Sequence, residues 1–334
     1  MFLIAAALAI VTTLLIALAI WQAVSARRDA QRFPPPGSLS AIAGTRLHVL
    51  DLGASSPAVV LEAGIAASSL SWRPLQYEIA RFTRVVSYDR AGLGWSEPAT
   101  AARSLDQLVW ELHELSANAA PFLLVGHSFG GLVARAYAAK HPEDVAGLVL
   151  LDPVLPSEWC DLPQERQRLL SYGVMLSRRG ALLARLGIVR LTLTLAERGA
   201  RFIPKLIAKV SSGKGSGVPE RLIGEVRKLP PDLLPAIKAH WCQPKSFAAM
   251  ASYLALLPDA CEQARHWPPL SVPLTIISAG NATAAQIEEW DRLAAASPAG
   301  RHIRALTAGH WVHLDEPGLV LTAIRQTLEH VSAL

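Results

Sequence analysis

Residues 122–131 place a serine between two glycines in the pattern Gly-X-Ser-X-Gly. The residues before Gly126 are apolar, as in a buried strand, and those after Gly130 are typical of a helix. Because glycine has no side chain, Gly126 and Gly130 permit a turn sharp enough to push the Ser128 hydroxyl out of the sheet. Ser128 would then lie at a helix N-terminus, where free backbone N–H groups stabilise negative charge. The pattern predicts a nucleophile for acyl transfer.

The elements that must position this serine alternate along the chain. After residue 37, short β-branched runs are followed by helical stretches, which is typical of a mainly parallel sheet covered on both faces. The expected strands are 46–51, 58–61, 83–87, 122–125, 147–151, 274–278 and 302–306. The expected helices include 105–115, 130–140, 284–296 and 319–330. Between residues 153 and 273 the strand pattern disappears, which predicts a helical insertion.

Three further sequence blocks accompany the serine motif. They are Val-Leu-Glu-Ala-Gly-Ile at 60–65, Tyr-Asp-Arg-Ala-Gly-Leu-Gly-Trp-Ser at 88–96 and Gly-His-Trp-Val-His-Leu-Asp-Glu-Pro at 309–317. On these blocks the chain resembles the α/β-hydrolase superfamily from residue 33 to its C-terminus, except in the insertion. It is most similar to the esterase and proline-iminopeptidase-like branch. The resemblance implies an α/β-hydrolase fold, in which a doubly wound, mostly parallel sheet carries a helical cap.

The resemblance also implies roles for residues outside the serine motif. Acyl transfer needs hydrogen-bond donors aimed at the oxygen that becomes negative, and the family places them at the backbone N–H groups of Ile65 and Phe129. The general base would be His310, which follows a glycine in the loop between the last strand and the last helix. His313 is the competing base, and we interpret it as a packing residue. His127, beside the nucleophile, is interpreted as a packed residue of the turn.

The acid that orients the base is less evident. Most of the superfamily takes it from the loop after the strand expected at 274–278, yet no carboxylate follows there until Glu288. Some branches take it from the end of the preceding strand, where this chain has Asp152, and the order nucleophile, acid, histidine is then preserved. Asp152 is therefore the first candidate. Glu288, Glu289 and Asp291 stay open as alternatives, and a cap of the insertion's first turn is the structural role open to Asp152.

The N-terminus is nearly unbroken apolar sequence through Trp21, followed by Arg27, Arg28 and Arg32. About 20 apolar residues span a bilayer, so this segment predicts a single-pass transmembrane helix. A cleaved signal peptide with a site near Ala26 is the competing interpretation, although the apolar run is longer than a signal core and no basic residue precedes it. Because the arginines follow the span, the positive-inside rule places the catalytic domain in the cytoplasm.

The chain's charge is unevenly distributed. Residues 165–245 carry 16 Lys and Arg against five Asp and Glu, a net charge of +11, so the remainder carries −6 within an overall +5. Arg201, Lys205 and Lys209 recur at a helical spacing of four. This basic amphipathic stretch is expected either to pack on the core or to lie on anionic headgroups. No nucleic-acid recognition motif accompanies it, so we expect no nucleic-acid partner.

Composition excludes other classes of protein. With 334 residues, 51% of them hydrophobic, the chain is too apolar for a disordered protein. Cys160, Cys242 and Cys261 are too few and too scattered for a disulfide framework or a cysteine-based zinc site. The expected domains are an anchor at 1–24, a basic and Pro-rich linker at 25–37, a core at 38–153 and 268–334, and a helical cap at 154–267.

Together these patterns predict a membrane-anchored serine hydrolase that cleaves carboxylic esters with a hydrophobic acyl or alcohol part. No cofactor or metal is required, and the partners expected are an acyl substrate and the membrane. Three alternatives stay open: an aminopeptidase of the proline-iminopeptidase type, an acyltransferase, and a non-catalytic membrane-tethered binding protein. A dehalogenase is disfavoured, because that branch has an aspartate where this chain has Ser128.

Overall fold

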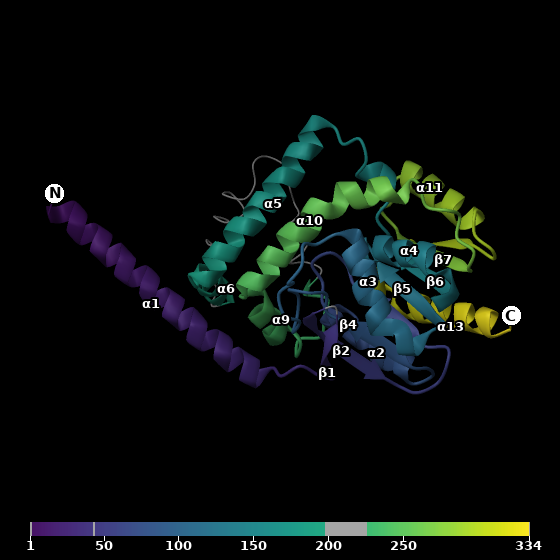
Figure 1. Cartoon of the computed structure of the whole chain (residues 1–334), viewed down its shortest axis with the longest axis horizontal. Coiled ribbons are helices and arrows are strands. Elements are labelled where there is room, and N and C mark those ends of the chain that lie inside the picture. The colour runs from purple at the N-terminus through teal and green to yellow at the C-terminus, as the bar shows by residue number, and fades with distance from the viewer. Residues whose placement is uncertain (1, 43, 198–225, 334) are drawn as a thin grey trace. The chain divides into compact units, whose positions relative to one another are not determined.

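The computed structural model describes residues 2–42, 44–197 and 226–333 (Figure 1). The chain forms two compact units. Met1–Pro34 and Ser171–Ala251 form the first, here called the helical unit. Pro35–Leu170 and Ser252–Leu334 form the second, here called the sheet unit. The basic run at Arg201, Lys205 and Lys209 lies outside the described residues.

The sheet unit is built on eight strands in the order β1-β2-β4-β3-β5-β6-β7-β8. The strands are β1 (Ser38–Ile42), β2 (Thr45–Leu52), β3 (Val59–Glu62), β4 (Val85–Tyr88), β5 (Phe122–His127), β6 (Val145–Leu151), β7 (Leu274–Ala279) and β8 (Arg301–Ala305). Only the pairings of β1 with β2 and of β2 with β4 are antiparallel. Strands β3, β4, β5 and β7 are buried along their whole length, as expected where helices cover both faces.

The direction of each crossover decides which face of the sheet a helix covers. The helices of this unit are α2 (Arg73–Ala80), α3 (Leu105–Ser116), α4 (Phe129–Lys140), α11 (Ala284–Ala295), α12 (Val312–Asp315) and α13 (Pro317–Ser332). Single 3₁₀ turns lie at Ser69–Ser71, Ala117–Ala119, Pro142–Asp144 and Pro156–Glu158. Helix α2 connects β3 to β4 and so leads toward the β1 edge of the sheet, whereas α3, α4 and α11 lead toward the β8 edge. Because crossovers between parallel strands are right-handed, α2 lies on the face opposite α3, α4 and α11. Helix α13 packs beside α2.

The predicted alternation and the α/β-hydrolase fold are confirmed. All seven expected strands and all four expected helices are present, with bounds that differ by a few residues. Apart from the 3₁₀ turns, three elements of the sheet unit were not predicted from the sequence: β1, α2 and α12. Strand β1 is a mostly exposed edge strand of five residues, so it lacks the apolar run of a buried strand. Helices α2 and α12 are only eight and four residues long, too short for a sequence window to separate them from loops.

The helical unit contains α1 (Phe2–Arg32), α6 (Ile188–Glu197), α9 (Leu234–Trp241) and parts of α5 (Gln164–Arg185) and α10 (Pro244–Ala264). Within residues 154–197 and 226–267, the described part of the insertion, the regular elements are helices, as expected. Helix α1 is the one helix within the described ranges that is long and apolar enough to cross a membrane, a test that a signal sequence also passes. It continues through Arg32, so residues 25–32 of the expected linker are helical.

Polar contacts join the end of α1 to the rest of the helical unit. Gln22 is buried, its Nε2 donates to the Cys242 carbonyl at 2.8 Å, and its Oε1 accepts from Nε of Arg190 at 2.6 Å. Nη1 of Arg190 lies 2.7 Å from a carboxylate oxygen of Asp29. A Cβ on Gly187 would approach the Leu18 carbonyl oxygen to 2.5 Å, so glycine permits the close contact there. Residues 18–29 thus pack as part of this unit.

Candidate active site

The nucleophile candidate lies on a strained turn between β5 and α4. Ser128 has φ 54° and ψ −118°, and it is the N-cap of α4. A Cβ on Gly126 would approach the Gly130 carbonyl oxygen to 2.6 Å, and one on Gly130 would approach the Ala63 carbonyl oxygen to 2.6 Å. Both glycines are therefore needed for the turn to pass between its neighbours. The Ser128 N–H donates to the Leu151 carbonyl at 2.9 Å, which ties the turn to the end of β6.

His310 reaches the serine from the loop that follows β8. Its Nε2 lies 2.9 Å from Oγ of Ser128, although 182 residues separate the two along the chain. Within the loop, the Gly309 N–H donates to the Asp315 carboxylate at 2.8 Å. The Gly280 N–H donates to the Ala308 carbonyl at 2.9 Å and joins the loop to the end of β7. These hydrogen bonds fix the loop, and the loop holds His310 within hydrogen-bonding distance of the Ser128 hydroxyl.

Asp152 follows the last residue of β6 and lies on the far side of the imidazole from the serine. Its Oδ2 is 2.6 Å from Nδ1 of His310, and its Oδ1 accepts the Ala279 N–H at 3.0 Å. The residue has φ 42°, a conformation that asparagine and aspartate adopt more readily than most residues. With Nδ1–H donating to Asp152, Nε2 of His310 carries the lone pair that can accept the serine proton.

The three other carboxylates that the sequence left open have different partners. Glu288 pairs with Arg292 at 3.3 Å, and Asp291 lies 2.8 Å from Nδ1 of His302. Glu289 accepts a hydrogen bond from the Ser157 hydroxyl. The structure therefore brings Asp152, and not these three, to His310.

The two other histidines near the nucleophile are buried. Nε2 of His127 donates to the backbone carbonyl of His310 at 2.8 Å, so His127 contacts the base through its main chain. Burial keeps the pKa of His127 well below its usual value, and the neighbouring His313 and His310 lower it further. The His313 ring packs on Trp72, with 4.4 Å between ring centroids. Both side chains occupy the packing positions expected of them.

A buried ionic network surrounds the loop that contains Ile65. The Arg90 guanidinium donates to the Glu62 carboxylate, to the Ala63 carbonyl at 2.8 Å and to the Gly64 carbonyl. Burial raises the pKa of Glu62, and the opposing effect of Arg90 is smaller. The Arg90 guanidinium also lies over the Phe129 ring, 5.1 Å from its centroid. Arg90 thus touches both segments whose N–H groups are the oxyanion candidates.

Asp89 and Arg90 are neighbours in the sequence block at 88–96 and could brace the structure as an ion pair. In the structure they do not pair with each other. Asp89 lies 2.9 Å from Nδ1 of His48 and accepts the backbone N–H groups of Ser69 and Trp95 at 2.7 and 2.9 Å. Burial opposes its ionisation, but these hydrogen bonds outweigh burial and lower the pKa of Asp89. The contact of Arg90 with the loop at Gly64 was missed, because nothing in the local sequence indicates it.

One side-chain cluster elsewhere in the sheet unit has metal-ligand types. Ligand atoms of His113, His141 and Asp144 lie within 4.8 Å of one another. Hydrogen bonds within the cluster account for its arrangement: His113 Nδ1 lies 3.1 Å from the Asp144 carboxylate, and the Tyr137 hydroxyl donates to the same oxygen at 2.8 Å. His113 lies in α3, and His141 and Asp144 follow the C-terminal end of α4, whereas Ser128 lies at the N-terminal end of α4.

A doubly wound sheet with a serine on a strand-to-helix turn, hydrogen-bonded to a histidine from the loop after the last strand, defines an α/β-hydrolase. The comparison with protein families agrees. The model of the alpha/beta hydrolase family matches residues 59–323, and the chain belongs to this family.

Curated relatives match the chain over about a third of its length. A 2-hydroxymuconate semialdehyde hydrolase of Pseudomonas sp. (strain CF600) is 37% identical over 129 residues, which are 36% of this chain and 44% of that protein. The lipase LipV of Mycobacterium tuberculosis is 39% identical over 112 residues, 33% of this chain and 42% of that protein. YqjL of Bacillus subtilis, an uncharacterised protein, is 37% identical over 129 residues, or 37% of this chain. The chain spans about half the length of these relatives.

Solved structures resemble the chain over most of its length. A thermophilic esterase from Thermogutta terrifontis has a TM-score of 0.58 at 23% identity, and the match covers 86% of this chain and 94% of that one. A variant of a potato epoxide hydrolase has a TM-score of 0.67 at 18% identity, with coverages of 88% and 98%. At such low identity these likenesses establish the fold alone.

Proposed function

We propose that the protein is a serine hydrolase that cleaves carboxylic esters through an acyl-enzyme. The observation that carries the proposal is the chain of two short contacts, 2.9 Å from Ser128 Oγ to His310 Nε2 and 2.6 Å from His310 Nδ1 to Asp152. A nucleophile, a base and an orienting carboxylate within this reach are what acyl transfer requires.

In the first half-reaction, Ser128 Oγ attacks the ester carbonyl while its proton passes to His310 Nε2. The negative oxygen of the tetrahedral intermediate accepts hydrogen bonds from the Ile65 and Phe129 N–H groups. The intermediate collapses, the bond to the alcohol oxygen breaks, and the departing alcohol takes the proton from His310. Asp152 keeps its hydrogen bond to Nδ1 throughout, so it stabilises the imidazolium without becoming protonated.

In the second half-reaction, water takes the place of the serine. His310 accepts a proton from the water as it attacks the acyl carbon, and the returning proton restores the Ser128 hydroxyl. The carboxylic acid leaves. An ester with a hydrophobic part is the substrate class we propose, supported by the similarity to a protein named a lipase and by the apolar helix α6 in the insertion.

Covalent labelling tests the nucleophile. Full-length protein is incubated with a fluorophosphonate probe, which reacts with activated serines. We expect labelling of the wild type and of Ser157→Ala, a variant of a serine that hydrogen-bonds to Glu289. We expect none of Ser128→Ala. Labelling that survives in Ser128→Ala would contradict the assignment, and an unlabelled wild type would favour the non-catalytic, membrane-tethered binding protein.

A substrate panel tests the bond that is cleaved. Acyl esters of increasing chain length and aminoacyl arylamides are offered to the same preparation. We expect kcat/KM to be highest for an apolar ester. Faster cleavage of the arylamides would instead identify an aminopeptidase of the proline-iminopeptidase type, since the same triad serves both bonds.

We propose further that α1 is retained as a membrane anchor. The support is the set of contacts at its C-terminal end, where Gln22 is buried and bonded to Arg190 and to the Cys242 carbonyl. Cleavage after Ala26 would remove Gln22 and leave the buried Arg190 without one of its partners. N-terminal sequencing of protein from washed membranes should therefore begin at the first residues of the chain. A sequence that begins at Arg27 would contradict retention.

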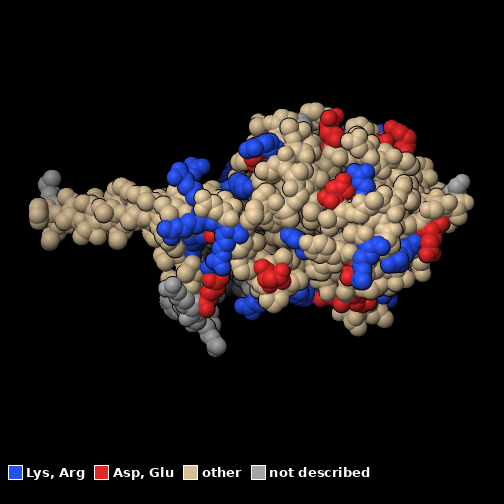
Figure 2. All heavy atoms as spheres, turned by 90° about the horizontal axis from the view of Figure 1, so that it is seen from below, with Lys and Arg blue, Asp and Glu red and all other residues tan. Residues whose placement is uncertain are grey.

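Exposed arginines near the end of α1 support a contact with anionic headgroups and a cytoplasmic catalytic domain. Figure 2 shows Lys and Arg side chains gathered around this end of the helix. The exposed arginines of the helical unit include Arg27, Arg28, Arg32, Arg178, Arg179 and Arg185. Leu182 is 57% exposed between two of them on α5.

A probe at Leu182 tests the headgroup contact. Leu182→Cys in a Cys160→Ser background is labelled with a fluorophore in nanodiscs, with Thr322→Cys on α13 as the control position. We expect anionic lipid to shield the probe at residue 182 from an aqueous quencher and to leave residue 322 unchanged. Equal quenching of residue 182 in neutral and anionic nanodiscs would contradict the contact.

A further inference from the structure

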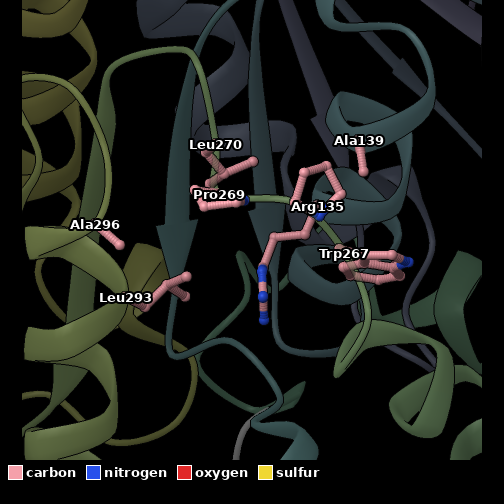
Figure 3. Close-up of a pocket in the computed structure, with 8 residues that line it drawn as sticks. Arg135, Ala139, Trp267, Pro269, Leu270, Leu293 and Ala296 are labelled. Atoms are coloured by element: carbon pink, nitrogen blue, oxygen red, sulfur yellow. The ribbon is translucent and has the colours of Figure 1, made fainter.

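A cavity of about 160 Å³ lies in the sheet unit, away from the serine. It opens between α4, the end of α11 and the segment 267–270 that leads to β7 (Figure 3). Its walls are mostly apolar and include Ala139, Trp267, Leu270, Leu293 and Ala296. This composition is typical of sites for small organic molecules.

Arg135 is the one charged residue in the lining of this cavity. Figure 3 shows its side chain projecting between Leu293 and Trp267. Its Nε is buried and has no hydrogen-bond partner. Across residues 2–42, 44–197 and 226–333, Arg135 forms no ion pair. The charge of Glu289 acts on it from a distance, but that carboxylate accepts a hydrogen bond from Ser157.

Arg135 is half-buried, and its buried Nε has lost water without gaining a hydrogen-bond partner. Burial lowers the pKa of Arg135 to about 10, and the charge of Glu289 offsets this effect only in part. Buried polar groups in proteins are nearly always paired, so an unpaired one calls for an explanation. A bound anion would supply the missing partner.

The shape and lining of the cavity restrict the charged group and the apolar body that the anion can have. The Trp267 ring lies 5.4 Å from the guanidinium carbon and occupies its face, so the N–H groups at its edge stay available to a planar carboxylate. The rest of the lining offers apolar contact. An apolar cavity of about 150 Å³ holds one benzene molecule, so the volume suits a single ring or a chain of that size.

We propose that this cavity is a binding site for a small carboxylate with an apolar body, held by Arg135 at the charged end. The site is separate from the reaction centre. Arg135 lies seven residues along α4 from Ser128, about 10 Å at 1.5 Å per residue, and its ligand does not meet the nucleophile. The proposal therefore goes beyond the hydrolase function and does not depend on it.

Calorimetric titration of the full-length protein with benzoate tests the site, with benzyl alcohol as the uncharged probe of the same ring. We expect saturable binding of benzoate, and binding of benzyl alcohol that is at least about tenfold weaker, because a charge-assisted hydrogen bond is lost. Arg135→Met should weaken benzoate by a similar factor. The matched control is Arg292→Met, an exposed arginine of α11 that pairs with Glu288, and it should leave benzoate affinity unchanged.

A second variant keeps the test valid if Arg135→Met does not fold. Leu270→Trp retains the arginine and fills the cavity, and it should also weaken benzoate by about tenfold or more. The proposal is overturned by the absence of saturable benzoate binding up to about 20 mM. It is also overturned if the wild type and either cavity variant bind benzoate with equal affinity. Competition by inorganic phosphate as strong as that by benzoate would likewise overturn it, because the site would then bind simple anions.

Discussion

The Arg90 guanidinium donates a hydrogen bond to the carbonyl oxygen of Gly64, and that carbonyl shares its peptide unit with the N–H of Ile65. In a trans peptide the C=O and the N–H point in opposite directions, so holding the one aims the other. A hydrogen bond to the carbonyl also polarises the N–H, which makes it a stronger donor. Arg90 is therefore a positioning residue for the oxyanion site that we propose.

Replacement of Arg90 should lower kcat more than it alters KM. Arg90→Lys keeps the charge but loses the planar fork that reaches Glu62, Ala63 and Gly64. Loss of a whole oxyanion donor costs about 100- to 1000-fold, so a misaimed donor should cost about 10- to 100-fold in kcat. The changes in kcat and KM are measured by steady-state kinetics with a short acyl ester.

The matched control for this variant is Arg103→Lys. Arg103 has a side chain that is also largely buried, 5% exposed against 2% for Arg90. It pairs with Glu111 at 2.6 Å and lies over the Tyr253 ring, as Arg90 does. Among the residues that the structure describes, it forms no hydrogen bond or ion pair with residues 63–65, so its replacement should lower thermal stability and leave the kcat of the folded enzyme intact. Equal losses of kcat in the two variants would mean that Arg90 acts through stability alone.

Removal of the carboxylate charge at residue 152 should nearly abolish turnover. Asp152→Asn no longer holds Nδ1–H toward itself, and the analogous change in a serine protease triad lowers kcat about 10⁴-fold. Glu288→Gln and Asp291→Asn change carboxylates that pair with Arg292 and His302, so they should stay close to wild-type kcat. A near wild-type Asp152→Asn enzyme would reject the assignment.

A methyl group at the nucleophile turn should destabilise the fold. The Cβ of Gly130→Ala would lie 2.6 Å from the Ala63 carbonyl oxygen, and that backbone belongs to the loop after β3. We expect a loss of about 2–4 kcal/mol in the free energy of unfolding, measured by urea denaturation. The control is Gly318→Ala in α13, where no atom lies within 4 Å of the added Cβ. It should be neutral or stabilise by up to about 1 kcal/mol.

The neutral state of His127 should make stability depend on pH. Its folded pKa lies well below the usual value, whereas the unfolded chain titrates near pH 6.5. Below about pH 6.5 the unfolded state therefore binds more protons, and the free energy of unfolding falls as the pH falls, by at most about 1.4 kcal/mol per pH unit. Above that pH the contribution of His127 is fully present.

His127→Gln isolates this contribution. Glutamine can still donate to the His310 carbonyl but does not titrate, so the stability of the variant should decline less between pH 7 and pH 5 than that of the wild type. Urea denaturation at a series of pH values gives both slopes. Parallel slopes would show that other groups cause the acid sensitivity.

The serine turn of the site could be predicted from the sequence, because its geometry depends on residues that are close together in the chain. The strand, the serine turn and the helix follow one another without a break over residues 122–140. The clashes that exclude a side chain at Gly126 arise from Gly130 and Gly131, only a few residues away. The alternation of strands and helices is equally local, since each element shows its own period. The apolar length of α1 is likewise a property of consecutive residues.

The partners of these local features were decided by the tertiary structure. The sequence placed Asp152 first among four candidate carboxylates but left the other three open. The parallel register that pairs Leu151 with Ile277 carries Asp152 to the end of the sheet where His310 arrives. The same holds for Arg90, whose contact with Gly64 depends on β4 lying beside β3. Hydrogen-bond partners separated by 26 to 182 residues leave no local signal, because only the packing of the sheet brings them within reach.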